Sequence, residues 1–311
     1  MRRPMLGTLA GAIIAAAMPA AAPRQSEQPV FKAQSELVVM HVSVRDRRGR
    51  YVMGLGQDAF TVIDDGQAQA LAMFSADEVP ASIAFLIDNS NSMRPNRERV
   101  IAAAIAFAAN SHPRDEISVL TFNESVTPAF GPALIQDIPE GSLRAAMDRA
   151  IIARGMTALY DAVVAGLRRV SGGVHTRQVL ILVSDGGDNA SSTTMDAAIK
   201  QVRDSDATMY TVTLTDTLVR EGNPGLMRQL ARESGGEAFH PRNVEDIPEV
   251  FERIARDIRS AYTLAYAPAH HGEGEDRRRA VRVYVRSSDG RPLSVRAREG
   301  YMERHPEAEP R

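Results

Sequence analysis

The sequence predicts an α/β protein with a doubly wound, mainly parallel sheet and a small β-sandwich beside it. Between residues 80 and 260, short apolar stretches alternate with amphipathic stretches of helical period, which is typical of a parallel sheet covered by helices on both faces. The flanks, 28–78 and 262–302, are rich in β-branched residues and glycine-containing turns. Neither flank has enough strands to be stable alone, so we expect the two to pair into one sandwich.

The elements of the α/β region follow one another along the chain. The expected strands are SIAFLID, EISVLTF, RQVLILVS and ATMYTVTL, and the expected helices are RERVIAAAIAFAAN, GSLRAAMDRAIIAR, ALYDAVVAGLRRV and TTMDAAIKQVRDS. GLMRQLARESGG, EAFHP and DIPEVFERIARDI continue the alternation. The region 80–260 is therefore expected to be one α/β domain.

The flanks are expected to be β-structure. ELVVMHVSVRD and AFTVIDDG alternate in the manner of strands, and DRRGR and DDGQ supply turns, so we expect hairpins here. AYTLAYAP, RRRAVRVYVRSSDG and LSVRAREGY have the same character after the α/β domain. We interpret the arginines at 277–279 as a solvated hairpin start of mixed charge rather than an ionic patch. Residues 303–311 are assigned as a tail.

The first residues have the features of a secretory signal peptide. Arg2 and Arg3 precede an apolar run that ends at about Met18, and small residues follow it. A membrane anchor is the alternative, but the run is shorter than the roughly 20 residues that span a bilayer. We therefore expect 1–22 to be removed and the protein to be exported to the periplasm or the extracellular space, with no membrane span in the mature chain.

Composition narrows the class of protein. The 311 residues are 44% hydrophobic and 24% charged, typical of a globular chain with one large domain or two moderate ones. The chain has no cysteine, so an exported form folds without disulfides. Loss of the two arginines of the signal peptide takes the formal charge from -2 to -4, which argues against a nucleic-acid partner held by its phosphates.

Three polar segments lie next to predicted strand or helix ends. Asp88, Ser90 and Ser92 follow the first α/β strand at two-residue spacing, Asp185 follows LILVS, and Thr157 precedes ALYDAVV. Ligands of open parallel sheets bind outside the carboxyl ends of the strands. Carboxylates and hydroxyls are hard oxygen donors, which suit Mg²⁺, or alternatively Mn²⁺ or Ca²⁺. The seven histidines show no spacing of zinc ligands, and His270–His271 is interpreted as a solvated turn.

Two of the three segments also have a simpler explanation. Asp88 or Ser90 could cap the helix that follows, and Asp185 with Asp188 could form an Asp-Gly turn. Only the three segments together favour a cation site, and Asp188 is left outside it.

Two other functional classes are open. Magnesium-dependent phosphatases of the haloacid dehalogenase type use a strand-end aspartate and a second aspartate two residues on. Here the second position is Ser90, and Lys200 lies on a predicted helix where a solvated role is expected. The sequence has no G-x-S-x-G motif, P-loop or histidine-centred nucleophile. A metal-free structural interaction module is the third class.

In this order, the three segments resemble the metal-ion-dependent adhesion site of von Willebrand factor type A domains: DNSNS at 88–92, GMTALYDAV around Thr157, and LVSDGGDN around Asp185. The resemblance covers about 80–260. The flanks, with VSVRDRRGRYVMGLGQDAFTVIDDGQAQALAMFS, YTLAYAP and VRAREGYM, are similar to a group of exported bacterial von Willebrand type A-related proteins.

The resemblance implies roles for these residues. Ser90 and Ser92 would bind the metal directly, Thr157 would join them in the ligand-bound form, and Asp88 and Asp185 would act directly or through water. Asn89 and Asn91 stand where the family often has Thr and Gly, and asparagine tolerates a left-handed backbone.

A carboxylate of a protein partner would complete the octahedron around the metal. The resemblance thus implies an exported, non-enzymatic, adhesion-type binding protein that captures an acidic group of its partner.

Overall fold

The computed structural model describes residues 37–214, 222–268 and 277–303. The predicted signal peptide 1–22, the His270–His271 turn and the tail after Glu303 lie outside these ranges. The described residues form one compact unit. Within the described ranges, no helix combines the length and apolar character needed to cross a bilayer.

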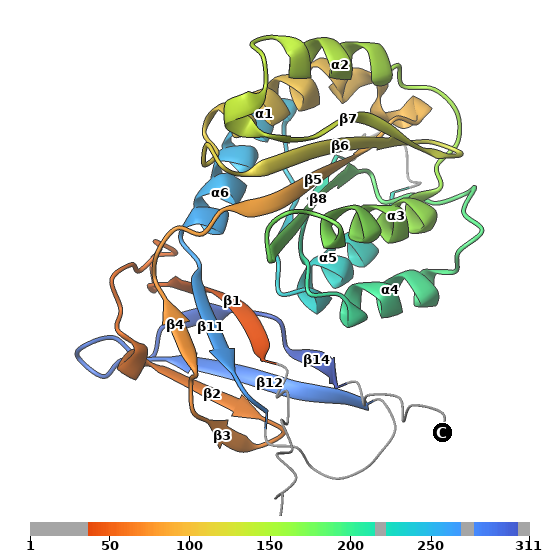
Figure 1. The fold of residues 1–311 in the computed structure, drawn as a ribbon. Helices are drawn as coiled ribbons and strands as arrows, with labels where there is room; N and C mark the ends of the chain where they lie inside the picture. Colours follow the sequence, from red (N-terminus) through yellow and green to blue (C-terminus); the bar gives the residue numbers. More distant parts are fainter. Residues whose placement is uncertain (1–36, 215–221, 269–276, 304–311) are drawn as a thin grey trace, which may run out of the picture. The chain divides into compact units, whose positions relative to one another are not determined.

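The α/β domain is built on a six-stranded sheet with the strand order β10-β9-β8-β5-β6-β7 (Figure 1). The strands are β5 (Ala81–Asp88), β6 (Glu116–Phe122), β7 (Val126–Leu134), β8 (Arg177–Ser184), β9 (Thr208–Thr213) and β10 (Ala238–Phe239). All neighbours pair in parallel except β6 and β7. Every residue of β5 and β6 is buried, as expected of central strands covered on both faces.

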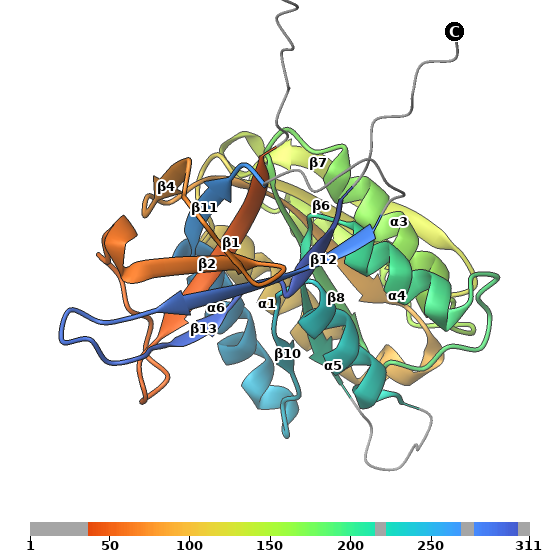
Figure 2. The ribbon, with the colours of Figure 1, turned by 90° about the horizontal axis from the view of Figure 1, so that it is seen from below.

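Helices cover both faces of this sheet (Figures 1 and 2). The α-helices are α1 (Arg97–Ala109), α2 (Ser142–Ala150), α3 (Leu159–Ser171), α4 (Met195–Asp204), α5 (Pro224–Glu233) and α6 (Ile247–Arg259). Alternate residues of β5 enter two cores, because successive side chains of a strand point to opposite faces. Phe85 packs with α1, α2 and α6, and Leu86 packs with α3, α4 and α5. The described residues also include short 3₁₀ helices, which are η1 (Gln57–Ala59), η2 (Asn91–Asn96), η3 (Ile135–Asp137) and η4 (Val244–Asp246).

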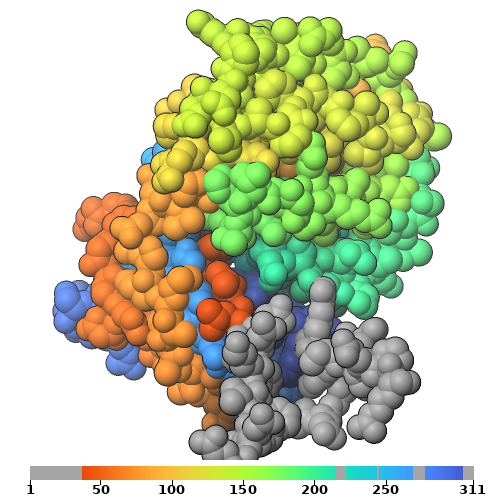
Figure 3. All heavy atoms as spheres, in the orientation of Figure 1, coloured from red at the N-terminus to blue at the C-terminus, as the bar shows by residue number. Residues whose placement is uncertain are grey.

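The two flanks form a sandwich of two four-stranded sheets, ordered β13-β1-β11-β4 and β14-β12-β2-β3. Its strands are β1 (Val38–Arg45), β2 (Phe60–Asp64), β3 (Gln67–Gln69), β4 (Met73–Ser75), β11 (Tyr262–Tyr266), β12 (Arg277–Val285), β13 (Ser294–Arg296) and β14 (Gly300–Glu303). β1 pairs with β11 and β2 with β12, both antiparallel. The orange and blue segments therefore lie side by side in Figures 2 and 3. The predicted fold class, including a sandwich made from both flanks, is confirmed.

The hairpin prediction is only half right. β2 and β3 form a hairpin whose turn residues Asp65 and Gly66 have φ of 45° and 83°, as a two-residue turn of this kind requires. β1 and β2, in contrast, belong to different sheets. Strand β7 was not predicted, because its sequence VTPAFGPAL contains a glycine, which weakens a strand, and two prolines, which strands accept mainly at a sheet edge or a bulge.

The interpretation of 277–279 as a solvated hairpin start is wrong for Arg279. This side chain is fully buried and its Nε lies 2.8 Å from Asp64 Oδ1, while its Nη1 lies 3.3 Å from Glu303 Oε1. Tyr266 and Tyr301 also donate hydrogen bonds to Asp64. The buried arginine is stable here because acidic groups from two strands neutralise it.

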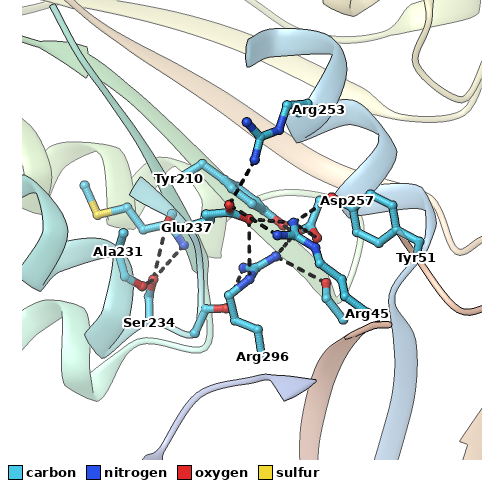
Figure 4. A network of polar contacts seen from close by, with 12 residues as sticks. Arg45, Tyr51, Tyr210, Ala231, Ser234, Glu237, Arg253, Asp257 and Arg296 are labelled. Atoms are coloured by element: carbon cyan, nitrogen blue, oxygen red, sulfur yellow. Dashed lines mark hydrogen bonds and ion pairs between the residues drawn. The ribbon is translucent and has the colours of Figure 1, made fainter. Parts of the chain in front are cut away.

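A second ionic network joins the sandwich to helix α6 and to the segment before β10 (Figure 4). The fully buried Asp257 accepts hydrogen bonds from Tyr210 Oη at 2.5 Å, Arg45 Nη2 at 3.2 Å and Arg296. Arg45 also donates to Glu237 at 2.6 Å. Burial alone would raise the pKa of Asp257, but Arg296, Tyr210 and Arg45 hold it below its usual value.

Candidate metal centre

Asp88 is the last residue of β5 and is fully buried. Its Oδ1 accepts the Ser90 N–H at 2.9 Å, and its Oδ2 accepts the hydroxyl of Ser184 at 2.6 Å. Ser184 ends the neighbouring parallel strand β8, so the two strand ends hold the carboxylate in one orientation.

The hydroxyls of Ser90 and Ser92 lie 3.1 Å apart. Adjacent ligands of an octahedral Mg²⁺ site, each about 2.1 Å from the ion, are about 3 Å apart. The two hydroxyls therefore have the separation of neighbouring metal ligands, and in the absence of a cation the same distance lets one donate a hydrogen bond to the other. Ser90 precedes η2 without a side-chain capping hydrogen bond, and Asn96 precedes α1 in the same way. The structure thus gives no support to the alternative in which the Ser90 hydroxyl serves as a helix cap.

Asp185 follows the end of β8 and is buried. Its Oδ1 accepts the Gly187 N–H at 2.9 Å, so the Asp-Gly turn considered from the sequence is present. Gly186 has φ of 87°, and a Cβ there would lie 2.8 Å from the Asn223 carbonyl oxygen. The turn thus requires glycine and places the carboxylate near Asp88, whose pKa it raises.

The loop that carries Thr157 is hydrogen-bonded to both strand-end loops. Asn91 donates its N–H to the Gly155 carbonyl at 3.3 Å. Thr157 donates its N–H to Asn189 Oδ1 at 2.8 Å, and Asn189 returns a bond to the Thr157 carbonyl at 2.9 Å. The structure therefore brings all three predicted segments to one end of the sheet.

The electrostatics of this site are unusual for a buried cluster. Burial raises the pKa of Asp88 to about 6, and the nearby Asp185 also raises it, while hydrogen bonds from Ser184 and Ser90 lower it. Among the described residues, no cationic side chain forms an ion pair with Asp88 or Asp185. Two carboxylates and several hydroxyls without a countercharge fit a hard divalent cation.

The described part of the chain offers few side chains of the types that usually bind zinc or soft metals. There, no group of three or more His, Cys, Asp or Glu side chains is arranged to hold a metal. A cation at this site would depend on the serine and threonine hydroxyls, which hard cations accept and soft metals do not favour.

Sequence reasoning missed two residues that build the site. Ser184 was treated as part of the strand, although a hydroxyl facing the strand-end Asp88 was a possible signal. Asn89 was noted only because asparagine tolerates a left-handed backbone, a conformation that it does not adopt here. The non-glycine residues with positive φ in the described ranges are Asp65 and Ala153. The Asn89 side chain instead accepts the N–H groups of Ile152 and Ala153 at 2.8 and 2.6 Å.

Two further residues take roles outside the site. Asp188 accepts hydrogen bonds from the Ser191 hydroxyl at 2.5 Å and the Tyr160 N–H at 3.3 Å, which fixes the start of α3. Lys200 pairs with Asp204 at 2.5 Å on the exposed face of α4. It is therefore occupied on the helix surface, as the sequence predicted.

Comparisons with known proteins agree with this architecture. A family profile described as von Willebrand factor type A domain matches residues 82–253. No curated protein matches the sequence. Members of the matched family mediate protein interactions.

Solved structures show the same fold at low sequence identity. Proximal thread matrix protein 1 from the mussel byssus is 16% identical with a TM-score of 0.51, and the match covers 64% of this chain and 51% of that one. Another structure of the mussel protein has 16% identity and a TM-score of 0.50, and the match covers 64% of this chain and 50% of that one. It is described as having a zinc-occupied MIDAS motif, that is, a metal-ion-dependent adhesion site with bound zinc.

A von Willebrand factor type A protein from Catenulispora acidiphila is 13% identical, with a TM-score of 0.48 and coverage of 85% and 73%. The present chain spans about half the length of the mussel protein. Because the family profile matches more than half of its length, the chain belongs to the von Willebrand factor type A domain family.

Proposed function

We propose that this protein is an exported, non-enzymatic binding protein that uses a divalent cation to capture an acidic group of a protein partner. One observation carries the proposal. The buried Asp88 and Asp185 have no cationic partner among the described residues, and they lie beside two hydroxyls with the separation of neighbouring metal ligands.

Each residue would have a distinct part in holding the cation. Ser90 and Ser92 would bind it directly, and Thr157 would add its hydroxyl when a partner is bound. Asp88 and Asp185 would supply charge, directly or through water. Because Asp88 already accepts two hydrogen bonds, a water-mediated role suits it best. The bound cation would supply an electrophilic centre for a carboxylate of the partner.

The choice of Mg²⁺, with Mn²⁺ or Ca²⁺ as alternatives, follows from the all-oxygen donors. The zinc named for the mussel MIDAS motif supports divalent binding in this fold without specifying the metal here. Export follows from the predicted signal peptide.

Binding is favoured over catalysis. A phosphatase of the haloacid dehalogenase type would need an acid where Ser90 stands, and Lys200 is paired on the surface of α4. The test is Mg²⁺-dependent hydrolysis of p-nitrophenyl phosphate. We expect none, and hydrolysis that vanishes in Asp88→Asn would reverse this choice.

The binding proposal is tested by affinity capture from the native envelope fraction in Mg²⁺. The immobilised protein should retain a partner that EDTA releases, and Ser90→Ala/Ser92→Ala should retain none. A matched control is Ser287→Ala, in an exposed turn of the sandwich. Equal retention by all three proteins, with no effect of EDTA, would contradict metal-bridged capture.

A further inference from the structure

Beside the candidate metal centre, residues 152–156 present an apolar edge to solvent. Ile152 and Met156 are 46% and 51% exposed, and Arg154 between them is also exposed. The intervening Ala153 and the following Thr157 are buried. We call Ile152, Arg154 and Met156 the 152–156 ridge.

The amino-terminal part of the ridge is held in place by the metal-site loop. Asn89 accepts hydrogen bonds from the N–H groups of Ile152 and Ala153 at 2.8 and 2.6 Å. Its carbonyl accepts the Arg154 N–H at 2.8 Å. The ridge is thus fixed to the residue that follows Asp88.

The carboxyl-terminal part is held from the other side. Glu124 Oε1 accepts the Met156 N–H at 2.8 Å, and Asn123 donates to the Arg154 carbonyl at 3.3 Å. Gly155 has φ of 88°, and a Cβ there would meet the Glu124 carboxylate at 2.4 Å. Because the backbone is fixed at both ends, the ridge loses little conformational freedom when a partner binds.

Exposed apolar side chains also occur elsewhere, as at Val174 and Tyr284, and single ones need no explanation. The ridge differs because two of them stand on one fixed segment that leads directly into Thr157. Positively charged side chains lie next to these two apolar residues. The exposed Arg94 donates to the Ala153 carbonyl at 3.3 Å and forms no ion pair within the described residues. Arg154 is partly balanced by the Glu124 carboxylate, whose pKa is lowered by hydrogen bonds to backbone N–H groups, chiefly that of Met156, and by Arg154.

We propose that the 152–156 ridge selects the partner, and that the partner is an acidic protein segment in which an apolar side chain stands beside the metal-bound carboxylate. The inference rests on the proposed metal-bridged capture. The apolar neighbour would pack on Ile152 and Met156, and the negative charge of the segment complements the exposed Arg94.

The experiment measures the binding of labelled peptides to the full chain in Mg²⁺ by fluorescence anisotropy. One peptide has an aspartate between two leucines, a second has serines in place of the leucines, and a third has asparagine in place of the aspartate. The leucine peptide should bind about tenfold more tightly than the serine peptide, because it buries apolar surface on the ridge. Ile152→Ser/Met156→Ser should remove this difference and leave the serine peptide within about twofold.

Val174→Ser/Tyr284→Ser is the matched control, because it removes two exposed apolar side chains that lie outside the ridge. It should preserve the tenfold preference. Equal affinity of the leucine and serine peptides, or an equal loss in both double variants, would overturn the ridge as the selecting surface, as would failure of all peptides to bind. Binding that EDTA does not affect, or equal affinity for the asparagine peptide, would instead overturn the metal-bridged capture.

Discussion

Asp88 and Asp257 are both fully buried, but their surroundings differ. Asp257 is surrounded by Arg45, Arg296 and the Tyr210 hydroxyl, which hold its pKa below the usual value against the effect of burial. Asp88 has only neutral donors, and burial raises its pKa to about 6. Both carboxylates are hydrogen-bonded, so hydrogen bonding alone does not separate them. The difference is the presence of a countercharge.

The presence or absence of a countercharge distinguishes a carboxylate that stabilises the fold from one that can bind a cation. Asp64, in the sandwich, is like Asp257 because Arg279 and two tyrosines surround it. In both cases the chain itself completes the charge balance, and removal of one member leaves a buried charge with fewer partners of opposite sign. At Asp88 and Asp185 the chain leaves the balance incomplete, and a cation would complete it.

The largest expected change in stability is at Asp257, the carboxylate with a countercharge. Asp257→Asn removes the fully buried carboxylate shared by Arg45 and Arg296 and leaves them only Glu237 as an acidic partner among the described residues, so it should lower the free energy of unfolding by about 3 kcal/mol. The matched control Asp196→Asn, exposed in the first turn of α4, should change it by less than about 0.5 kcal/mol. Urea unfolding followed by circular dichroism measures both. Equal effects would mean that the network in Figure 4 adds little to stability.

Asp88→Asn should have the opposite sign in metal-free protein. At pH 7 the wild-type carboxylate is ionised although its folded pKa is about 6, compared with about 3.9 for an unperturbed aspartate. Removing this charge should raise the free energy of unfolding by about 2 kcal/mol, after allowance for one lost acceptor. A clear loss of stability in EDTA would contradict the view that Asp88 is electrostatically uncompensated.

The pH dependence of stability should also differ between Asp88 and Asp257. The raised pKa of Asp88 means that its contribution to the stability of the metal-free protein is fully present below about pH 3.9 and is lost as the pH rises through about 6. The advantage of Asp88→Asn should therefore be present at pH 7 and shrink as the pH falls toward 4. The lowered pKa of Asp257 has the reverse effect, since its contribution is lost as the pH falls below the unfolded value. Paired urea titrations at pH 7, 5.5 and 4.5 would detect the trend, and a constant difference would contradict it.

The smallest expected effects are those of the serines. Ser92→Ala removes a half-buried hydroxyl and should change the metal-free stability by less than about 0.5 kcal/mol. Ser90→Ala removes a buried hydroxyl that interacts with the Asp88 carboxylate, so it should cost about 1 kcal/mol. Asp185→Ala relieves repulsion with Asp88 and should leave the metal-free protein equally stable or slightly more stable. A loss above about 2 kcal/mol in the serine variants would indicate a structural role instead.

Much of this molecule could be predicted because its signals are local in sequence. Continuous apolar runs indicated β5, β6, β8 and β9, and polar residues after strands indicated the three site segments. The missed features depend on tertiary contacts. Helix α2 was expected to continue to Arg154 but ends at Ala150, because Asn89 binds the backbone of the following residues. The burial of Arg279 depends on Asp64, which is more than 200 positions away.

The central claim is that a divalent cation completes the charge balance at Asp88 and Asp185 through the hydroxyls of Ser90 and Ser92. Its most direct test is the thermal shift produced by Mg²⁺ or Mn²⁺ in the wild type, Ser90→Ala/Ser92→Ala and Asp185→Ala. At a metal concentration a hundredfold above Kd, the wild type should gain about 2.7 kcal/mol, and both variants should lose most of this gain. An equal shift in all three proteins would mean that the cation binds elsewhere, and no shift in any of them would mean that this site holds no such cation.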